Sequence, residues 1–131
     1  MNYNAIITRL YYLLIYADGD ANEKELALAR QMTKSEGMKE ADFAAQLTLL
    51  KSRSNDSLYN ETISALKKLD RVRQVRAVAW LCVLANADGF MERSEWQLIY
   101  KIYHKELSLP LNEIFDVQKQ LNKMLWEKNY T

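Results

Sequence analysis

Residues 10–25 read LYYLLIYADGDANEKE, and residues 80–95 read WLCVLANADGFMERSE. In each stretch an apolar run leads into Ala-Asp-Gly, and a Glu follows six residues after the Gly. The two copies are Ala17-Asp18-Gly19 with Glu25, and Ala87-Asp88-Gly89 with Glu95. A helix that is apolar on most of its circumference is usually buried, and a Gly just beyond it marks its end. Both stretches therefore predict a central helix, an acidic turn and a second helix.

The two stretches belong to a longer internal repeat. Residues 13–36 and 83–106 align without a gap and are identical at seven of 24 positions: Leu14/Leu84, Ala17/Ala87, Asp18/Asp88, Gly19/Gly89, Glu25/Glu95, Leu28/Leu98 and Glu36/Glu106. We therefore expect two pseudo-symmetric helical halves, about residues 4–51 and 71–128, within a single domain of residues 1–131.

Helical periodicity extends over the rest of the chain. Apolar residues recur at intervals of three and four, which places them on one helix face. This spacing predicts seven helices, at about residues 4–17, 22–35, 40–51, 57–69, 71–87, 92–107 and 112–128. Only three glycines and one proline are present, which is little turn material for many short strands. The expected fold class is all-α, a compact domain of about seven helices.

The composition excludes several functions and locations. A net charge of +1 gives no overall field that would recruit nucleic acid or an anionic membrane, so we expect no nucleic-acid partner. The chain start lacks a basic signal region, and the apolar runs are too short to span a bilayer. The lone Cys82 lies in an apolar run and is expected to be a small buried hydrophobe. These features predict a cytoplasmic protein without a transmembrane segment.

One basic cluster has two interpretations. Lys67, Lys68, Arg71, Arg73 and Arg76 follow one another near the junction of the fourth and fifth predicted helices. They could contact phosphate or an acidic partner. The sequence favours a solvated face, because no aromatic residue interleaves as a stacking platform for bases.

The acidic turns resemble the back half of a calcium-binding loop, but their front half argues against an EF-hand. The two earlier ligand positions hold Leu14 and Tyr16 in the first copy, and Leu84 and Asn86 in the second. A different carboxylate site is still open: the turns offer Asp18, Asp20, Glu23, Glu25, Asp88, Glu92 and Glu95. If the halves bring these groups together, a divalent cation would relieve their mutual repulsion.

A purely structural interpretation competes with metal binding. Asn22 and Glu25 have the spacing of a capping box, in which each residue satisfies the other's backbone N–H. In the second turn Glu92 takes the place of Asn22, and Glu is a poor cap. Capping thus explains the first turn better than the second.

No arrangement of residues indicates catalysis. The only histidine, His104, has no nucleophile or acid placed around it and is expected near the end of the sixth helix. No Gly-rich phosphate loop and no zinc-type Cys/His spacing occur in the sequence. We therefore expect a protein that is not an enzyme.

The two motifs Leu14-Ile15-Tyr16-Ala17-Asp18-Gly19 with Glu25, and Leu84-Ala85-Asn86-Ala87-Asp88-Gly89 with Glu95, resemble the tellurite-resistance TerB-like family over about residues 4–128. That family also supplies the front domain of some membrane-anchored J-domain proteins. The resemblance implies an all-helical, non-enzymatic stress-response domain linked to metal-oxyanion resistance and to membrane-associated protein complexes.

The resemblance also implies a divalent-metal site. Its residues here would be Asp18, Glu25, Asp88 and Glu95, with Asp20 and Glu92 as further candidates, and it does not distinguish calcium, magnesium, manganese and zinc. Phe90 replaces Asp20 in the second copy, so the two turns are not equivalent. Two hypotheses follow: a metal-binding adaptor or sensor, or a protein-interaction module without metal whose acidic turns only cap helices.

Overall fold

A computed structural model describes residues 1–16, 21–87, 89 and 91–130, with side chains up to residue 127. Within these residues the secondary structure is helical throughout: α1 (Tyr3–Ile15), α2 (Glu23–Ser35), α3 (Glu40–Leu50), α4 (Asn55–Leu66), α5 (Arg71–Ala85), α6 (Arg93–Tyr100), the π-helix η1 (Lys101–Glu106) and α7 (Leu111–Tyr130). The predicted all-α fold is confirmed, and its helices occur in the predicted order.

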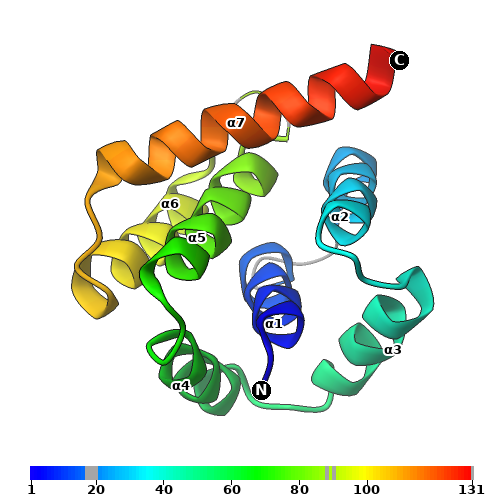
Figure 1. The fold of residues 1–131 in the computed structure, drawn as a ribbon. Helices are drawn as coiled ribbons and strands as arrows, with labels where there is room; N and C mark the ends of the chain where they lie inside the picture. The colour runs from blue at the N-terminus through cyan, green and yellow to red at the C-terminus, as the bar shows by residue number, and fades with distance from the viewer. Residues whose placement is uncertain (17–20, 88, 90, 131) are drawn as a thin grey trace.

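Two helices, α1 and α5, form the centre of the molecule (Figure 1). Helix α1 packs on α3, α4 and α5, and α5 packs on α2, α6 and α7. From Val75 to Ala85 every residue of α5 except Arg76 is buried. In α1 the buried residues extend from Ile6 to Ile15 on most sides of the helix. Their continuous apolar sequence explains why both helices are surrounded by others.

One packing contact recurs in the two halves. Helix α1 packs on α3 in the first half, and α5 packs on α7 in the second. The two central helices also contact each other, which joins the halves directly (Figure 1). The pseudo-twofold relation and the single domain over residues 1–131 stay predictions.

Polar side chains cap the N-termini of several helices. Asp70 Oδ1 accepts the Arg73 backbone N–H at 2.8 Å at the start of α5, as its position before an apolar run indicates. The predicted start of the fourth helix at Ser57 is wrong, because Ser54 is the cap and its hydroxyl oxygen accepts the Ser57 N–H at 3.3 Å. Helix α4 therefore begins two residues earlier, at Asn55.

The core contains Trp80, Tyr11 and the free Cys82, each at most 1% exposed. The prediction that Cys82 is a buried hydrophobe is confirmed, and burial raises the pKa of its thiol to about 12. Among the described helices, none is both long enough and apolar enough to cross a membrane.

Candidate functional site

Glu25 lies in the first turn of α2 and forms the predicted capping box. Its side-chain Oε1 accepts the Asn22 backbone N–H at 2.9 Å, and Asn22 Oδ1 accepts the Glu25 N–H at 2.8 Å. The two bonds satisfy donors that the helix start leaves without intrahelical partners. One oxygen of the Glu25 carboxylate is thereby held beside the first acidic turn.

Glu95 occupies the equivalent position in α6. Glu92 is the capping residue of α6 although glutamate is a poor cap. Its backbone N–H donates to Glu95 Oε1 at 3.3 Å. Glu95 is only 9% exposed, whereas Glu25 is half-buried. The two glutamates thus make the same local hydrogen bond but differ in how deeply they are buried.

Gly89 ends the second central segment as its sequence position suggests. Its φ is 88°, a backbone conformation that favours glycine. Gly89 lies four residues beyond Ala85, the last residue of α5, and its N–H donates to the Asn86 carbonyl at 2.9 Å. The chain therefore turns at Gly89, beyond the end of α5.

The remaining predicted ligands lie outside the described residues. These are Asp18 and Asp20 in the first turn and Asp88 in the second. Among the residues that are described, no group of three or more His, Cys, Asp or Glu side chains is placed to hold a metal. The described part of the chain supplies Glu23 and Glu25 to the first turn, and Glu92 and Glu95 to the second. A complete ligand set would therefore need the aspartates.

Tyr11 is a group near the first turn that the sequence analysis did not single out. Its side chain is fully buried, and its hydroxyl has no hydrogen-bond partner among the described residues. Desolvation, followed by the charges of Tyr16 and Glu25, raises the pKa of this phenol. Because its pKa is raised, this phenol stays protonated and is a poor ligand for a divalent cation. The repeat-equivalent residue is Leu81, so only the first turn has this group.

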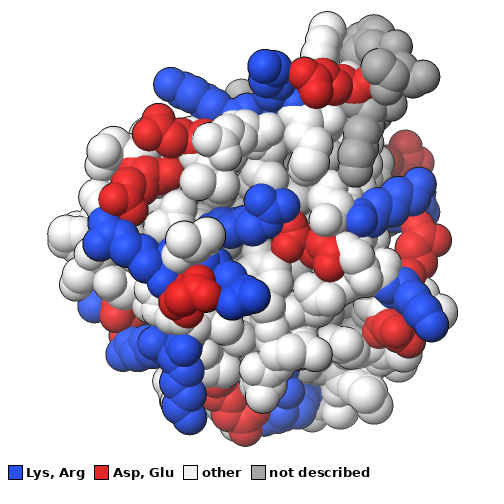
Figure 2. All heavy atoms as spheres, in the orientation of Figure 1, with Lys and Arg blue, Asp and Glu red and all other residues white. Residues whose placement is uncertain are grey.

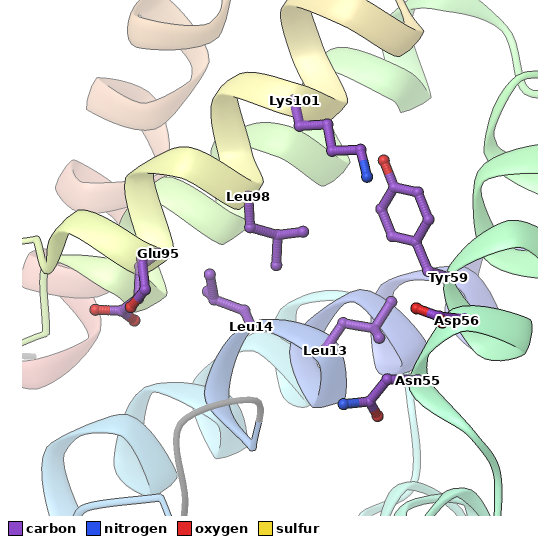
Figure 3. Close-up of a pocket in the computed structure, with 9 residues that line it drawn as sticks. Leu13, Leu14, Asn55, Asp56, Tyr59, Glu95, Leu98 and Lys101 are labelled. Atoms are coloured by element: carbon purple, nitrogen blue, oxygen red, sulfur yellow. The ribbon is translucent and has the colours of Figure 1, made fainter.

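A cavity of about 250 Å³ lies between the C-terminal part of α1, the start of α4, and α6 (Figure 3). Its lining residues are Leu13, Leu14, Asn55, Asp56, Tyr59, Ser94, Glu95, Leu98 and Lys101. Glu95 thus belongs both to the second acidic turn and to the wall of a cavity between the halves. Sequence reasoning missed this cavity because it is assembled from three segments far apart in the chain.

The repeated Glu36 and Glu106 both anchor long-range contacts. Glu36 Oε1 accepts from Arg76 Nε at 2.7 Å and from Trp80 Nε1 at 3.0 Å. Glu106 Oε2 accepts the Tyr59 hydroxyl at 2.8 Å. Each glutamate therefore joins its own helical segment to a different helix, α5 in one case and α4 in the other.

Most of the basic cluster is neutralised by neighbouring carboxylates. Nitrogen–oxygen distances join Lys67 to Glu106 at 3.5 Å, Arg71 to Glu113 at 2.7 Å, Arg73 to Asp70 at 2.7 Å and Arg76 to Glu36 at 2.6 Å. Figure 2 shows positive and negative side chains interspersed over one face of the molecule. The pairing argues against the phosphate-binding interpretation of this cluster.

His104 lies in the last turn of η1, near the predicted place. Its ring stacks on that of Tyr100, with centroids 4.8 Å apart and an interplanar angle of 23°. Both side chains are exposed, so the pair forms an aromatic surface feature.

Comparison with known proteins gives one result that covers most of the chain. The family model described as "Tellurite resistance protein TerB" matches residues 5–114. No curated protein and no solved structure gives a significant match. The match spans α1 to the start of α7 and both acidic turns. The chain therefore belongs to the TerB family, whose members are described as tellurite resistance proteins.

Proposed function

We propose that this TerB-family chain is a non-enzymatic adaptor or sensor that binds a divalent cation at its acidic turns. The first turn would contribute Asp18, Asp20 and Glu25, and the second Asp88, Glu92 and Glu95. The proposed partner is another protein, and the proposed place of action is the cytoplasm. The interspersed surface charge supports a partner other than nucleic acid (Figure 2).

The observation that carries the proposal is the matched placement of Glu25 and Glu95. Each is the third residue of its helix, and one oxygen of each accepts the N–H of the capping residue. A carboxylate held in this way loses less side-chain entropy on binding a ligand than a free one. When bound, the cation would supply the positive charge that offsets repulsion among neighbouring carboxylates.

A titration of the isotope-labelled protein tests the proposal. Calcium, magnesium, manganese and zinc are added separately while backbone amide signals are followed. We expect saturable changes centred on Gly19 and Gly89 for at least one cation. Unchanged signals at both glycines with all four cations would contradict metal binding.

The second candidate function is a protein-interaction module without metal. It is favoured by the capping bonds themselves, which give Glu25 and Glu95 a structural role that needs no cation. Glutamine at N3 also forms a capping box, so Glu25→Gln and Glu95→Gln remove charge while keeping the cap. If the wild type shows no cation response and these variants keep its stability, the two glutamates act only as caps.

A further inference from the structure

The surface of α4 beside the start of the chain carries more positive than negative charge. This surface, the α4 face, consists of Glu61, Ser64, Ala65, Lys68 and Leu69. We propose that it binds a short segment of a partner protein in which two carboxylates flank an apolar side chain. The inference rests on the proposed adaptor function and names the chemistry of the partner. It does not depend on metal binding.

A hollow of about 430 Å³ lies on the α4 face, where Met1 forms its far side. In Figure 1 the start of the chain lies beside α4. Ser64 and Ala65 have small side chains and leave this space open. Met1, which is 57% exposed, and the half-buried Leu69 give the hollow apolar surface. Covering that surface with a hydrocarbon side chain removes it from water, which favours association.

Two arginines share one carboxylate oxygen at one end of the hollow. Glu61 Oε2 lies 3.1 Å from Arg9 Nη1 and 2.6 Å from Arg53 Nη2. The hydrogen bonds from Arg53 and Arg9 lower the pKa of the Glu61 carboxyl, which is therefore ionised at neutral pH. Among the described residues, Glu61 is the only side chain with which either arginine pairs. Two guanidiniums against one carboxylate leave one positive charge uncompensated, and a second carboxylate would complete the cluster.

Lys68 supplies a further positive charge at the other end of the hollow. It is exposed, and it is the one member of the basic cluster without a carboxylate partner among the described residues. The nearby Asp70 is paired with Arg73 at 2.7 Å. Glu61 and Lys68 are seven residues apart, which is two helical turns or about 10 Å. Complementary charge therefore steers an acidic segment to both ends of the hollow.

The distance between the two ends sets the spacing of the partner's acidic residues. An extended segment rises about 3.3 Å per residue, so carboxylates three residues apart in sequence span about 10 Å. An apolar residue between them would lie over the hollow. A single phosphate group is too compact to reach both ends. The expected pattern is therefore an acidic residue, an apolar residue, a residue of any type and a second acidic residue.

Four ligands test the proposal on the whole 131-residue chain, with a chelator present throughout. The first is acetyl-Gly-Glu-Leu-Ser-Glu-Gly-amide, and the second has Ser in place of Leu. The third is the isomer acetyl-Gly-Leu-Glu-Glu-Ser-Gly-amide, whose acidic residues are adjacent, and the fourth is inorganic phosphate. Backbone amide signals of Ser64, Ala65 and Lys68 are followed by NMR. We expect saturable shifts with the first peptide and affinities weaker by about threefold or more with the other three ligands.

Charge variants should change the affinity for the first peptide in opposite directions. Arg53→Gln should weaken it by about threefold, whereas Glu61→Gln should strengthen it by about twofold to threefold, because the variant lacks the carboxylate that competes for the arginines. Lys68→Gln should weaken binding by about threefold. The matched control is Lys123→Gln, exposed on α7, which in Figure 1 lies on the other side of α5 from α4. It should leave the affinity unchanged.

A second pair of variants tests the hollow itself. Ser64→Phe should fill it and reduce affinity for the first peptide by about tenfold, whereas Asn60→Phe, exposed on α4 but outside the lining, should not. The proposal would be overturned by unchanged amide signals, by equal affinity for the two isomers or for phosphate, by weaker binding of Glu61→Gln, or by equal effects of the two Phe variants. Because a chelator is present, each of these outcomes is distinguishable from a failure of metal binding.

Discussion

At the scale of single residues, Glu36 shows how one carboxylate joins the two halves. Its Oε1 lies 2.6 Å from Arg76 Nη2, 2.7 Å from Arg76 Nε and 3.0 Å from Trp80 Nε1. The Glu36 side chain is only 7% exposed, so water screens these interactions weakly. Removing the carboxylate would leave the buried Trp80 indole N–H without its acceptor, whereas the Arg76 side chain is 36% exposed and can reach water.

We predict that Glu36→Ala lowers the free energy of unfolding by about 1–3 kcal/mol, because it leaves the buried Trp80 N–H unsatisfied and removes the ion pair with Arg76. Glu61→Ala is the matched control. Glu61 also pairs with two arginines, Arg9 and Arg53, but its side chain is 48% exposed. Its loss should lower the free energy of unfolding far less than the loss of Glu36 does, because water screens an exposed ion pair. Urea unfolding monitored by circular dichroism measures both, and equal effects would refute the account of Glu36.

The sequence identified Glu36 as a repeated position but did not reveal its partner. Arg76 is 40 residues away and lies in a basic cluster that a solvated face would explain equally well. Only the packing of α2 against α5 brings the two side chains together. The burial of the Tyr11 hydroxyl was not predicted either, because a tyrosine within an apolar run gives no indication of whether its hydroxyl contacts water.

At the scale of helices, the sequence predicted type and order well because these depend on local spacing. The caps Asn22 and Asp70 were identified from residue type and position, and both form their bonds. The π-helix η1 was not predicted: residues 92–107 have a continuous helical pattern, but α6 ends at Tyr100. Side-chain periodicity alone does not reveal an altered backbone hydrogen-bond register.

We predict that Asp70→Ala destabilises the protein by about 1 kcal/mol, because α5 loses the cap bond to the Arg73 N–H. Asp70→Asn should restore most of the loss, since asparagine caps equally well while removing the charge that pairs with Arg73. Thermal unfolding of the two variants measures this difference. If Asn is as damaging as Ala, the ion pair and not the cap sets the stability at this position.

At the scale of the whole molecule, burial of titratable groups in the centre makes stability depend on alkaline pH. Burial raises the pKa of Cys82 from its ordinary value of 9.0 to about 12. Desolvation also raises the pKa values of Tyr3 and Tyr11. The unfolded chain therefore releases these protons at a lower pH than the folded one.

We predict that the free energy of unfolding is constant up to about pH 9 and falls above it, by about 1–2 kcal/mol near pH 10.5 from Cys82 alone. Denaturant unfolding at several pH values measures the slope. Cys82→Ala should reduce this slope, and its thiol in the wild type should stay unreactive to a maleimide near pH 8 until the chain unfolds. A rise in stability above pH 9 would contradict the burial argument.

The overall architecture was more predictable than the candidate site. Long apolar runs specify α1 and α5 as central helices whatever surrounds them. The cavity that includes Glu95 depends on how α1, α4 and α6 approach one another, which no short pattern encodes. Cation binding at the acidic turns likewise depends on how the carboxylates are arranged in space, which their spacing in the sequence does not encode.

Glu25 and Glu95 are proposed to bind a divalent cation in addition to capping their helices. A calorimetric cation titration of the double variant Glu25→Gln/Glu95→Gln tests this, with Glu40→Gln, in the first turn of α3, as the control. We predict that the double variant keeps wild-type thermal stability without metal and loses cation binding by about tenfold or more, while Glu40→Gln binds as the wild type does. Unchanged cation affinity in the double variant would contradict the claim.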